Sequence, residues 1–210
     1  VGCKRGASIS IGKGIPLAAG LGGGAADAAA TLQGLNQLWG LGLSLDRLLS
    51  LASEVSSDAA FFLYGGTALG EGRGERVTPL PPLAPCWVVL LKPAIDVPHN
   101  KTQRMYAALD ASHFTPGEFT GRMVGLLEKG GDIPLSPLFN VFDGVAFSTF
   151  PGLEEYWGRF LALGAEDIHL AGSGPALFTL TKDRDQAERL YLKLAKEGLE
   201  TYLVKTRAKL

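Results

Sequence analysis

A cluster of glycines directly before an alanine-rich stretch constrains this chain more than any other feature. Residues 16–30 read PLAAGLGGGAADAAA, so that Gly20, Gly22, Gly23 and Gly24 precede an apolar pattern typical of a helix. Glycine lacks a Cβ and can take positive φ, which lets several N–H groups turn toward one point. The first turn of the helix adds unpaired N–H groups and the positive end of its dipole. The segment therefore has the physical features of a phosphate-binding loop.

Two other glycine motifs, and a simple packing turn, are alternative explanations. A P-loop requires Gly-Lys-Ser/Thr, whereas this cluster ends in alanines, and the Gly-Lys pair at Lys13 is followed by glycine. A dinucleotide fingerprint fits Gly20, Gly22 and Ala25, with Asp46 about 20 residues further on, near the distance that this fingerprint asks for. Asp46, however, follows what reads as a helix cap and does not end a second strand. The local order therefore argues against the dinucleotide motif.

The loop resembles the nucleotide loop of the GHMP small-molecule kinases, and later segments of the chain resemble that family in the same order. These are LNQLW at residues 35–39 with GLS at 42–44, SDAAFF at 57–62, GGTALGEGRGE at 65–75 and AGSGPALF at 171–178. The GLGGG spelling and the GEGRGE segment favour the isoprenoid-pathway branch, which phosphorylates a hydroxyl of diphosphocytidyl-methylerythritol. Mevalonate, homoserine and other small-alcohol kinases of the family remain alternatives, as does a nucleotide-binding remnant without turnover.

The resemblance implies an ATP- and Mg²⁺-dependent phosphotransferase with Asp58 as the catalytic proton acceptor. Asp58 lies in the segment that matches the family's catalytic-aspartate motif. From the residues alone it reads as a helix N-cap, and the two roles are compatible. The ATP-binding residues implied are Lys13, Pro16, Leu17, Ala18, Ala19, Gly20, Leu21, Gly22, Gly23, Gly24, Ala25 and Ala26. For Lys13, a solvated lysine at a strand end is an equal alternative.

The substrate side is implied by two further segments. Thr102 matches a family threonine that meets the substrate, with His99 as the second match, and Gly172, Ser173 and Gly174 form a glycine loop whose backbone would face the substrate or support the ATP loop. Alternatively, Thr102 lies only in a helix first turn and the glycine loop is a tight turn between strands. Ser173 is not a candidate nucleophile, because no His and acid pair is placed to activate it.

The chain departs from the family pattern in two places. Ala25 and Ala26 stand where the family usually has serines, so hydroxyl contacts to phosphate are missing. The sequence opens VGCKR and enters a predicted strand at residues 8–11 almost at once. The family's first strands, its catalytic lysine and its cytidine contacts have no counterpart, so we expect a truncated product. The strand edge so exposed favours self-association, and a homo-oligomer is therefore possible.

Composition excludes several classes of partner. The chain has 210 residues, 46% of them hydrophobic and 20% charged, with a net charge of −1, which favours neither nucleic acid nor a membrane surface as a partner. No apolar run reaches membrane-spanning length. Cys3 and Cys86 are expected to be free thiols in a reducing, cytoplasmic compartment. His99, His113 and His169 show no metal-ligand spacing, so no metal ligands are assigned.

The predicted fold class is α+β, a two-domain GHMP kinase fold. It combines an incomplete ribosomal S5 domain 2-like nucleotide domain at residues 1–82 with a ferredoxin-like substrate-side domain at 83–210, divided by the prolines at 79, 81, 82 and 85. Helices are predicted at 24–39, 44–55, 101–109, 120–128, 139–147, 152–163 and 185–197, with a short helix after Asp58. Strands are predicted at 8–11, 67–70, 77–80, 87–91, 168–171, 176–181 and 201–206.

Overall fold

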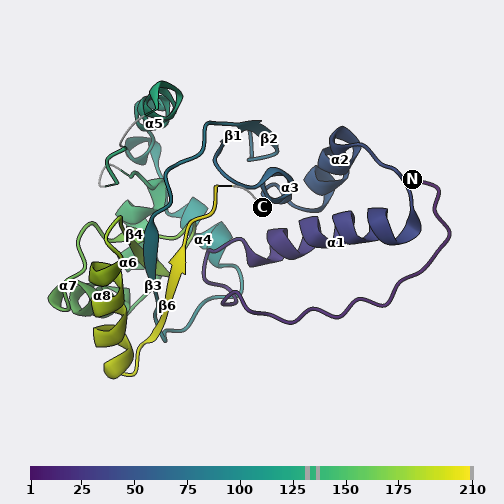
Figure 1. The fold of residues 1–210 in the computed structure, drawn as a ribbon. Helices are drawn as coiled ribbons and strands as arrows, with labels where there is room; N and C mark the ends of the chain where they lie inside the picture. The colour runs from purple at the N-terminus through teal and green to yellow at the C-terminus, as the bar shows by residue number, and fades with distance from the viewer. Residues whose placement is uncertain (131–132, 136–137, 209–210) are drawn as a thin grey trace. The chain divides into compact units, whose positions relative to one another are not determined.

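The computed structural model describes residues 1–130, 133–135 and 138–208 (Figure 1). Its contacts group the chain into two compact units. The first contains Val1–Leu17 and Gly22–Leu83, and the second contains Ala18–Leu21 and Ala84–Arg207. The predicted functional division at residues 82 and 83 remains a prediction, because compactness does not assign roles. Among the described helices, none is both long and apolar enough to cross a bilayer.

The first unit begins with helices whose ends the sequence predicts well. Helix α1 spans Gly23–Trp39 and ends at Gly40, which has φ of 60°. Helix α2 spans Leu45–Val55, and the Ser44 side chain caps it by accepting a hydrogen bond of 3.3 Å from the Arg47 amide. Both boundaries follow from local chemistry, since glycine tolerates the left-handed end of a helix and serine satisfies a first-turn N–H group.

A short helix and a hairpin complete the first unit. Helix α3 spans Ala59–Tyr64, and strands β1 (Ala68–Glu71) and β2 (Arg76–Pro79) pair antiparallel. The strands predicted at residues 67–70 and 77–80 are thus confirmed to within one residue at each end. Its turn is closed locally, because the Glu75 carboxylate accepts a 2.6 Å hydrogen bond from the Arg73 amide.

Small side chains form the core of the first unit. The buried cluster consists of Ala25, Ala29, Leu48, Ala52, Ala59 and Leu63, contributed by α1, α2 and α3. Along α1, Ala25 and Ala29 are buried whereas Leu38 is 68% exposed. The reason is the position of α3, which brings the Phe62 ring to Gly22, so that burial concentrates near the start of α1.

The predicted strand at residues 8–11 is wrong. These residues have no regular secondary structure, and Ile9 and Ile11 are 55% and 52% exposed. An alternating pattern forms a strand only when a neighbouring strand satisfies its backbone groups and covers one face. In the described residues, neither of the two sheets includes this segment.

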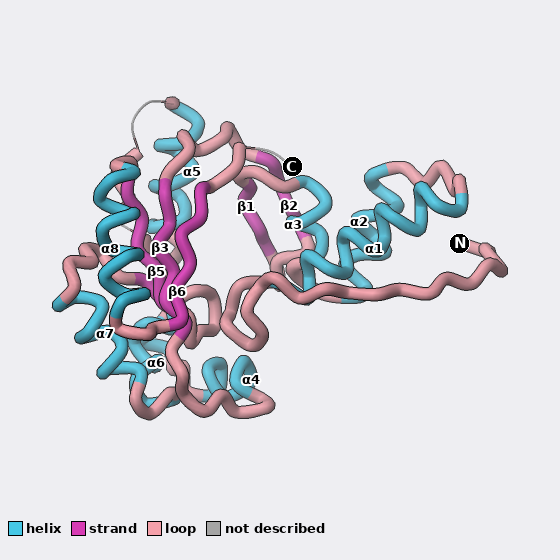
Figure 2. The backbone as a smooth tube through the Cα atoms, turned by 60° about the horizontal axis from the view of Figure 1, so that its bottom comes forward, coloured by secondary structure: helices cyan, strands magenta, loops and turns pink. Residues whose placement is uncertain are grey.

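The second unit contains a four-stranded antiparallel sheet. Its strands are β3 (Trp87–Lys92), β4 (His169–Leu170), β5 (Leu177–Thr181) and β6 (Glu200–Lys205), in the order β4-β5-β3-β6. Counted within this unit, that order is 2-3-1-4, as in a ferredoxin-like sheet, which confirms the predicted architecture. Helix α8 (Arg184–Lys196) packs on β3, β5 and β6, as Figure 2 shows.

The remaining helices of the second unit surround a large apolar core. They are α4 (Lys101–Ala107), α5 (Glu118–Lys129), α6 (Ala146–Thr149), α7 (Leu153–Ala162) and the 3₁₀ helices η1 (Ala111–His113) and η2 (Val141–Val145). The largest fully buried side chains include Phe150, Phe160 and Leu91. The single helix predicted at residues 139–147 is wrong. The segment instead contains the 3₁₀ helix η2, which Asn140 caps, followed by the start of α6.

Candidate functional site

The start of α1 leaves backbone donors open. Gly22 is the N-cap residue with φ of 67°, and no side chain caps this end of the helix. The first turn contains no acidic residue, and a Cβ placed on Gly24 would meet no atom within 4 Å. The free N–H groups therefore combine with the helix dipole to favour an anion here.

Three contacts within the first unit hold this helix end in place. The Ile15 side chain lies over Gly23, where a Cβ would stand 3.1 Å from its Cγ2 atom, and the Phe62 ring lies against Gly22. The Lys13 ammonium forms an ion pair with the Asp27 carboxylate on the second turn of α1. Lys13 therefore ties the preceding segment to the helix. Asp27 was missed in the sequence, where an acid inside an alanine-rich helix reads as a solvated surface residue.

Asp58 occupies the N-cap position of α3, but its carboxylate makes no capping hydrogen bond. The residue is exposed, and its Oδ1 atom lies beside the hairpin turn, 3.3 Å from where a Cβ of Gly74 would be. Gly74 has φ of 105°, so the turn depends on glycine for its backbone conformation as well as for this approach. The Asp58 carboxylate is thus free to accept a proton or a hydrogen bond from a ligand, because it accepts no capping hydrogen bond from a described amide of α3.

The segment Ala18–Leu21 is built into the second unit beside the glycine loop at residues 172–174. The Ala176 amide donates a 3.2 Å hydrogen bond to the Ala19 carbonyl. A Cβ on Gly20 would overlap the Ala171 carbonyl oxygen and stand 2.9 Å from the Gly174 nitrogen. The two glycine-containing segments are therefore in direct backbone contact, which side chains would prevent.

The Asn140 side chain also holds the glycine loop. Its side-chain amide donates to the Leu170 carbonyl at 3.0 Å and to the Gly172 carbonyl at 2.8 Å. Its oxygen accepts from the Phe142 amide at 3.1 Å. One side chain thus binds two carbonyl groups at the start of the glycine loop. The sequence offers only the weak signal of an asparagine before a turn.

Lys101, Thr102 and Ser173 form a polar cluster at the glycine loop. The Thr102 and Ser173 hydroxyls share a hydrogen bond of 3.1 Å, and the Lys101 ammonium donates to the Ser173 hydroxyl at 3.2 Å and to the Gly174 carbonyl. Burial lowers the pKa of Lys101 to about 8. The structure therefore brings together two predicted substrate-side residues and adds a lysine that the sequence analysis missed.

A hollow of about 450 Å³ adjoins this cluster. It is lined by Ala18, Val97, Pro98, His99, Asn100, Lys101, Thr102 and Gln103. The lining includes one residue of the predicted ATP loop and both sequence matches for substrate contact, His99 and Thr102. Most of these lining residues have polar side chains, and the hollow is large enough to admit part of a ligand.

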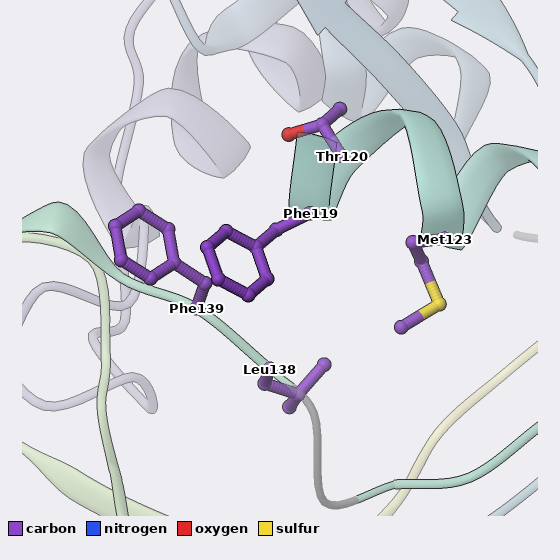
Figure 3. A pocket seen from close by; sticks show the side chains of 5 residues that line it. All are labelled: Phe119, Thr120, Met123, Leu138 and Phe139. Carbon is purple, nitrogen blue, oxygen red and sulfur yellow. The ribbon is translucent and has the colours of Figure 1, made fainter. Parts of the chain in front are cut away.

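A second hollow, of about 200 Å³, has a different character. Phe119 and Met123 of α5 line it together with Leu138 and Phe139, and the two phenyl rings stack 4.7 Å apart (Figure 3). Thr120 is the one polar residue among the described residues of its lining. Since these five described residues carry no charged group, we assign no step of phosphate chemistry to this hollow.

Comparison with known proteins identifies the family. The family model for the GHMP kinases N terminal domain matches residues 1–66, and the model for the GHMP kinases C terminal domain matches residues 123–200. A 4-diphosphocytidyl-2-C-methyl-D-erythritol kinase from Dehalococcoides mccartyi is 48% identical over 98% of this chain and 72% of its own length. The chain belongs to the GHMP kinases.

Solved structures agree with this assignment. A crystal structure of a 4-(cytidine 5'-diphospho)-2C-methyl-D-erythritol kinase matches 92% of this GHMP kinase and 68% of its own chain, with 35% identity and a TM-score of 0.74. A homoserine kinase from Cytophaga hutchinsonii, 22% identical with a TM-score of 0.72, covers 94% of this chain and 68% of its own and shares the fold. The two-domain α+β prediction is therefore confirmed.

The cysteines and histidines of this GHMP kinase are dispersed. Cys3 and Cys86 are both free. His99 borders the larger hollow, His113 belongs to η1, and His169 is buried in β4 against the Phe178 ring. Across the described ranges, no group of three or more His, Cys, Asp or Glu residues is arranged to hold a metal ion.

Proposed function

We propose that this chain transfers the γ-phosphoryl group of ATP to the 2-hydroxyl of 4-diphosphocytidyl-2-C-methyl-D-erythritol. The observation that carries the proposal is the uncapped start of α1 after Gly22, which offers free amides to a triphosphate. The 48% identity to a kinase named for this substrate supports the choice of acceptor. We further propose a cytoplasmic location, in keeping with two free cysteines.

In this proposal the chain's own groups orient the reactants and move one proton. Backbone amides at residues 20–26 hold the triphosphate, with Lys13 fixing the loop through its pair with Asp27. Asp58 accepts the proton of the attacking hydroxyl as the new oxygen–phosphorus bond forms. The bond between the γ-phosphorus and its bridging oxygen breaks, and ADP leaves with that electron pair. Thr102, Gly172, Ser173 and Gly174 position the acceptor.

Mg²⁺ enters the proposal as a partner of the nucleotide. The described side chains contain no preformed cluster of potential ligands. Magnesium keeps several waters and is commonly held by substrate phosphates with one or two carboxylates. When bound in this way, it neutralises charge on the transferring phosphoryl group, and we assign it no residue of this chain.

Measuring ADP release with ATP, Mg²⁺ and the cytidyl substrate tests the function. Asp58→Asn should lower turnover at least about a hundredfold, as expected for a general base, while ATP affinity changes little. Asp46→Asn is a matched control, because Asp46 is an exposed aspartate in the first turn of α2 and should leave turnover unchanged. Homoserine and mevalonate serve as competing acceptors and should give no ADP.

Three results would refute the proposal. The first is no turnover by the wild-type chain with the cytidyl substrate. The second is turnover that Asp58→Asn leaves intact. The third is preference for homoserine or mevalonate, which would move the chain to another branch of the family. ATP binding without turnover would instead support a nucleotide-binding remnant.

A further inference from the structure

Lys101 lies at the larger hollow with a positive charge that no described carboxylate offsets. Lys101 is partly buried, and the two hydrogen-bond partners of its ammonium, the Ser173 hydroxyl and the Gly174 carbonyl, are both neutral. In the described part of the chain, no ion pair involves this lysine. Burying a cation without an anion is costly, so the arrangement is favourable only if a further group balances the charge.

The chemistry of the hollow indicates what that group is. A lysine ammonium has three donors, and two of them are used here, which leaves one for a ligand. The Thr102 hydroxyl and the side-chain amides of Asn100 and Gln103 border the same hollow and supply further hydrogen-bonding groups. Among the described residues, no carboxylate lines the hollow, so these residues would attract an anion without opposing repulsion. Phosphate oxygens fit this combination of a compact positive charge and neutral donors.

We propose that Lys101 is the anion-recognising residue of this hollow and binds a phosphate group of a ligand. The proposed function supplies two sources of that group, the diphosphate of the cytidyl substrate and the triphosphate of ATP. The inference rests on the proposed function only for the identity of the ligand. The hollow, the unneutralised ammonium and the neutral donors stand without it.

Equilibrium binding by calorimetry tests this inference with three probes: the cytidyl substrate, a non-hydrolysable ATP analogue and inorganic pyrophosphate. Lys101→Met removes the charge but keeps most of the stem, and it should weaken at least one of the two nucleotides about tenfold, as for the loss of a charge-assisted hydrogen bond. Lys101→Arg keeps a cation and should recover part of the affinity. Arg104→Met is the matched control, since Arg104 is an exposed cation on the same helix that does not line the hollow.

The arms of the experiment separate the possible results. Selective loss of substrate binding assigns the site to the diphosphate of the substrate, and selective loss of the ATP analogue assigns it to the triphosphate. If Lys101→Met binds all three probes as Arg104→Met does, the inference is wrong. If the wild-type chain has no kinase activity but its pyrophosphate binding depends on Lys101, the proposed function fails while the anion site stands.

Proton uptake gives a readout that a purely structural lysine would not change. An anion at Lys101 stabilises the charged form and raises its pKa, so binding near pH 8.5 should take up a fraction of a proton. Of the described residues that line the hollow, His99 is the only other one with a titratable side chain, and His99→Gln tests its contribution. Uptake is measured from the binding enthalpy in buffers of different ionisation enthalpy. Equal uptake by wild-type and Lys101→Met protein would contradict the inference.

Discussion

Gly20 lies so close to Ala171 that a Cβ built on it would overlap the Ala171 carbonyl oxygen. The contact is reciprocal, because a Cβ on Gly172 would stand 2.8 Å from the Gly20 carbonyl oxygen. Two segments about 150 residues apart in sequence are thus in backbone contact. Since Gly20 also has φ of 84°, both the space and the backbone conformation require glycine.

Replacing Gly20 should therefore strongly lower the stability of the fold. Gly20→Ala combines a left-handed conformation that costs about 1–2 kcal/mol with a clash against fixed backbone, for a total loss of unfolding free energy of about 3 kcal/mol or more. Urea unfolding followed by circular dichroism measures this loss. Gly34→Ala is the control, because a Cβ there meets no atom within 4 Å and the residue lies inside α1, where alanine adds up to about 1 kcal/mol of stability. Equal stability of the two variants would show that the backbone contact is not maintained.

The capping and catalytic explanations for Asp58 predict different stabilities for an Asp58→Ala variant. Because its carboxylate makes no capping bond, Asp58→Ala should change the unfolding free energy by about 0.5 kcal/mol or less. Ser44→Ala removes a real cap and should cost about 1 kcal/mol. Thermal or urea unfolding of both variants makes the comparison. A larger loss in Asp58→Ala than in Ser44→Ala would show that Asp58 mainly stabilises α3.

Removing the Asn140 side chain should loosen the glycine loop. Asn140→Ala deletes three hydrogen bonds and removes the side-chain partner of the carbonyl of Leu170, a buried residue, at a cost of about 2 kcal/mol. The KM for the acceptor should rise about tenfold, because Gly172 loses its support. Steady-state kinetics and urea unfolding give the two values.

Asn36→Ala is the matched control for Asn140. Asn36 also bonds backbone through both atoms of its amide, at the Leu43 nitrogen and oxygen, but it lies at the end of α1 away from the glycine loop in sequence. It should lower stability by a similar amount and leave the KM unchanged. A similar rise in KM for both variants would mean that the Asn140 effect is a general consequence of destabilisation.

The Lys101 ammonium makes stability depend on pH in a specific window. Its pKa is about 8 in the folded chain and 10.5 ordinarily, so between these values the unfolded chain binds more protons and stability rises with pH. Below about pH 8 the full cost of burying the charge is present. The difference in urea midpoint between Lys101→Met and wild-type protein should therefore be largest at pH 7 and shrink toward pH 10. A constant difference would show that the lysine titrates normally.

Local chemistry in the sequence was sufficient to predict where most helices and strands end and to indicate the family. The helices predicted at 24–39 and 44–55 and the strands predicted at 67–70 and 77–80 form to within one residue at each end, because capping and turn formation depend on neighbouring residues. The glycine loop and the SDAAFF segment were also readable, since phosphate binding and proton transfer require particular residue types at short spacing. The predicted roles of the individual site residues await the experiments above.

Only the tertiary structure decided which residues meet across long stretches of sequence. The contact of Gly20 with Ala171, the Asn140 bonds to the glycine loop and the position of Lys101 all join segments at least 30 residues apart, and no local pattern encodes them. The same limit explains the error at residues 8–11, where strand-like alternation lacks a pairing strand among the described residues. The periodicity of a segment's side chains depends on its own sequence, whereas its burial and strand pairing depend on which other segments pack against it.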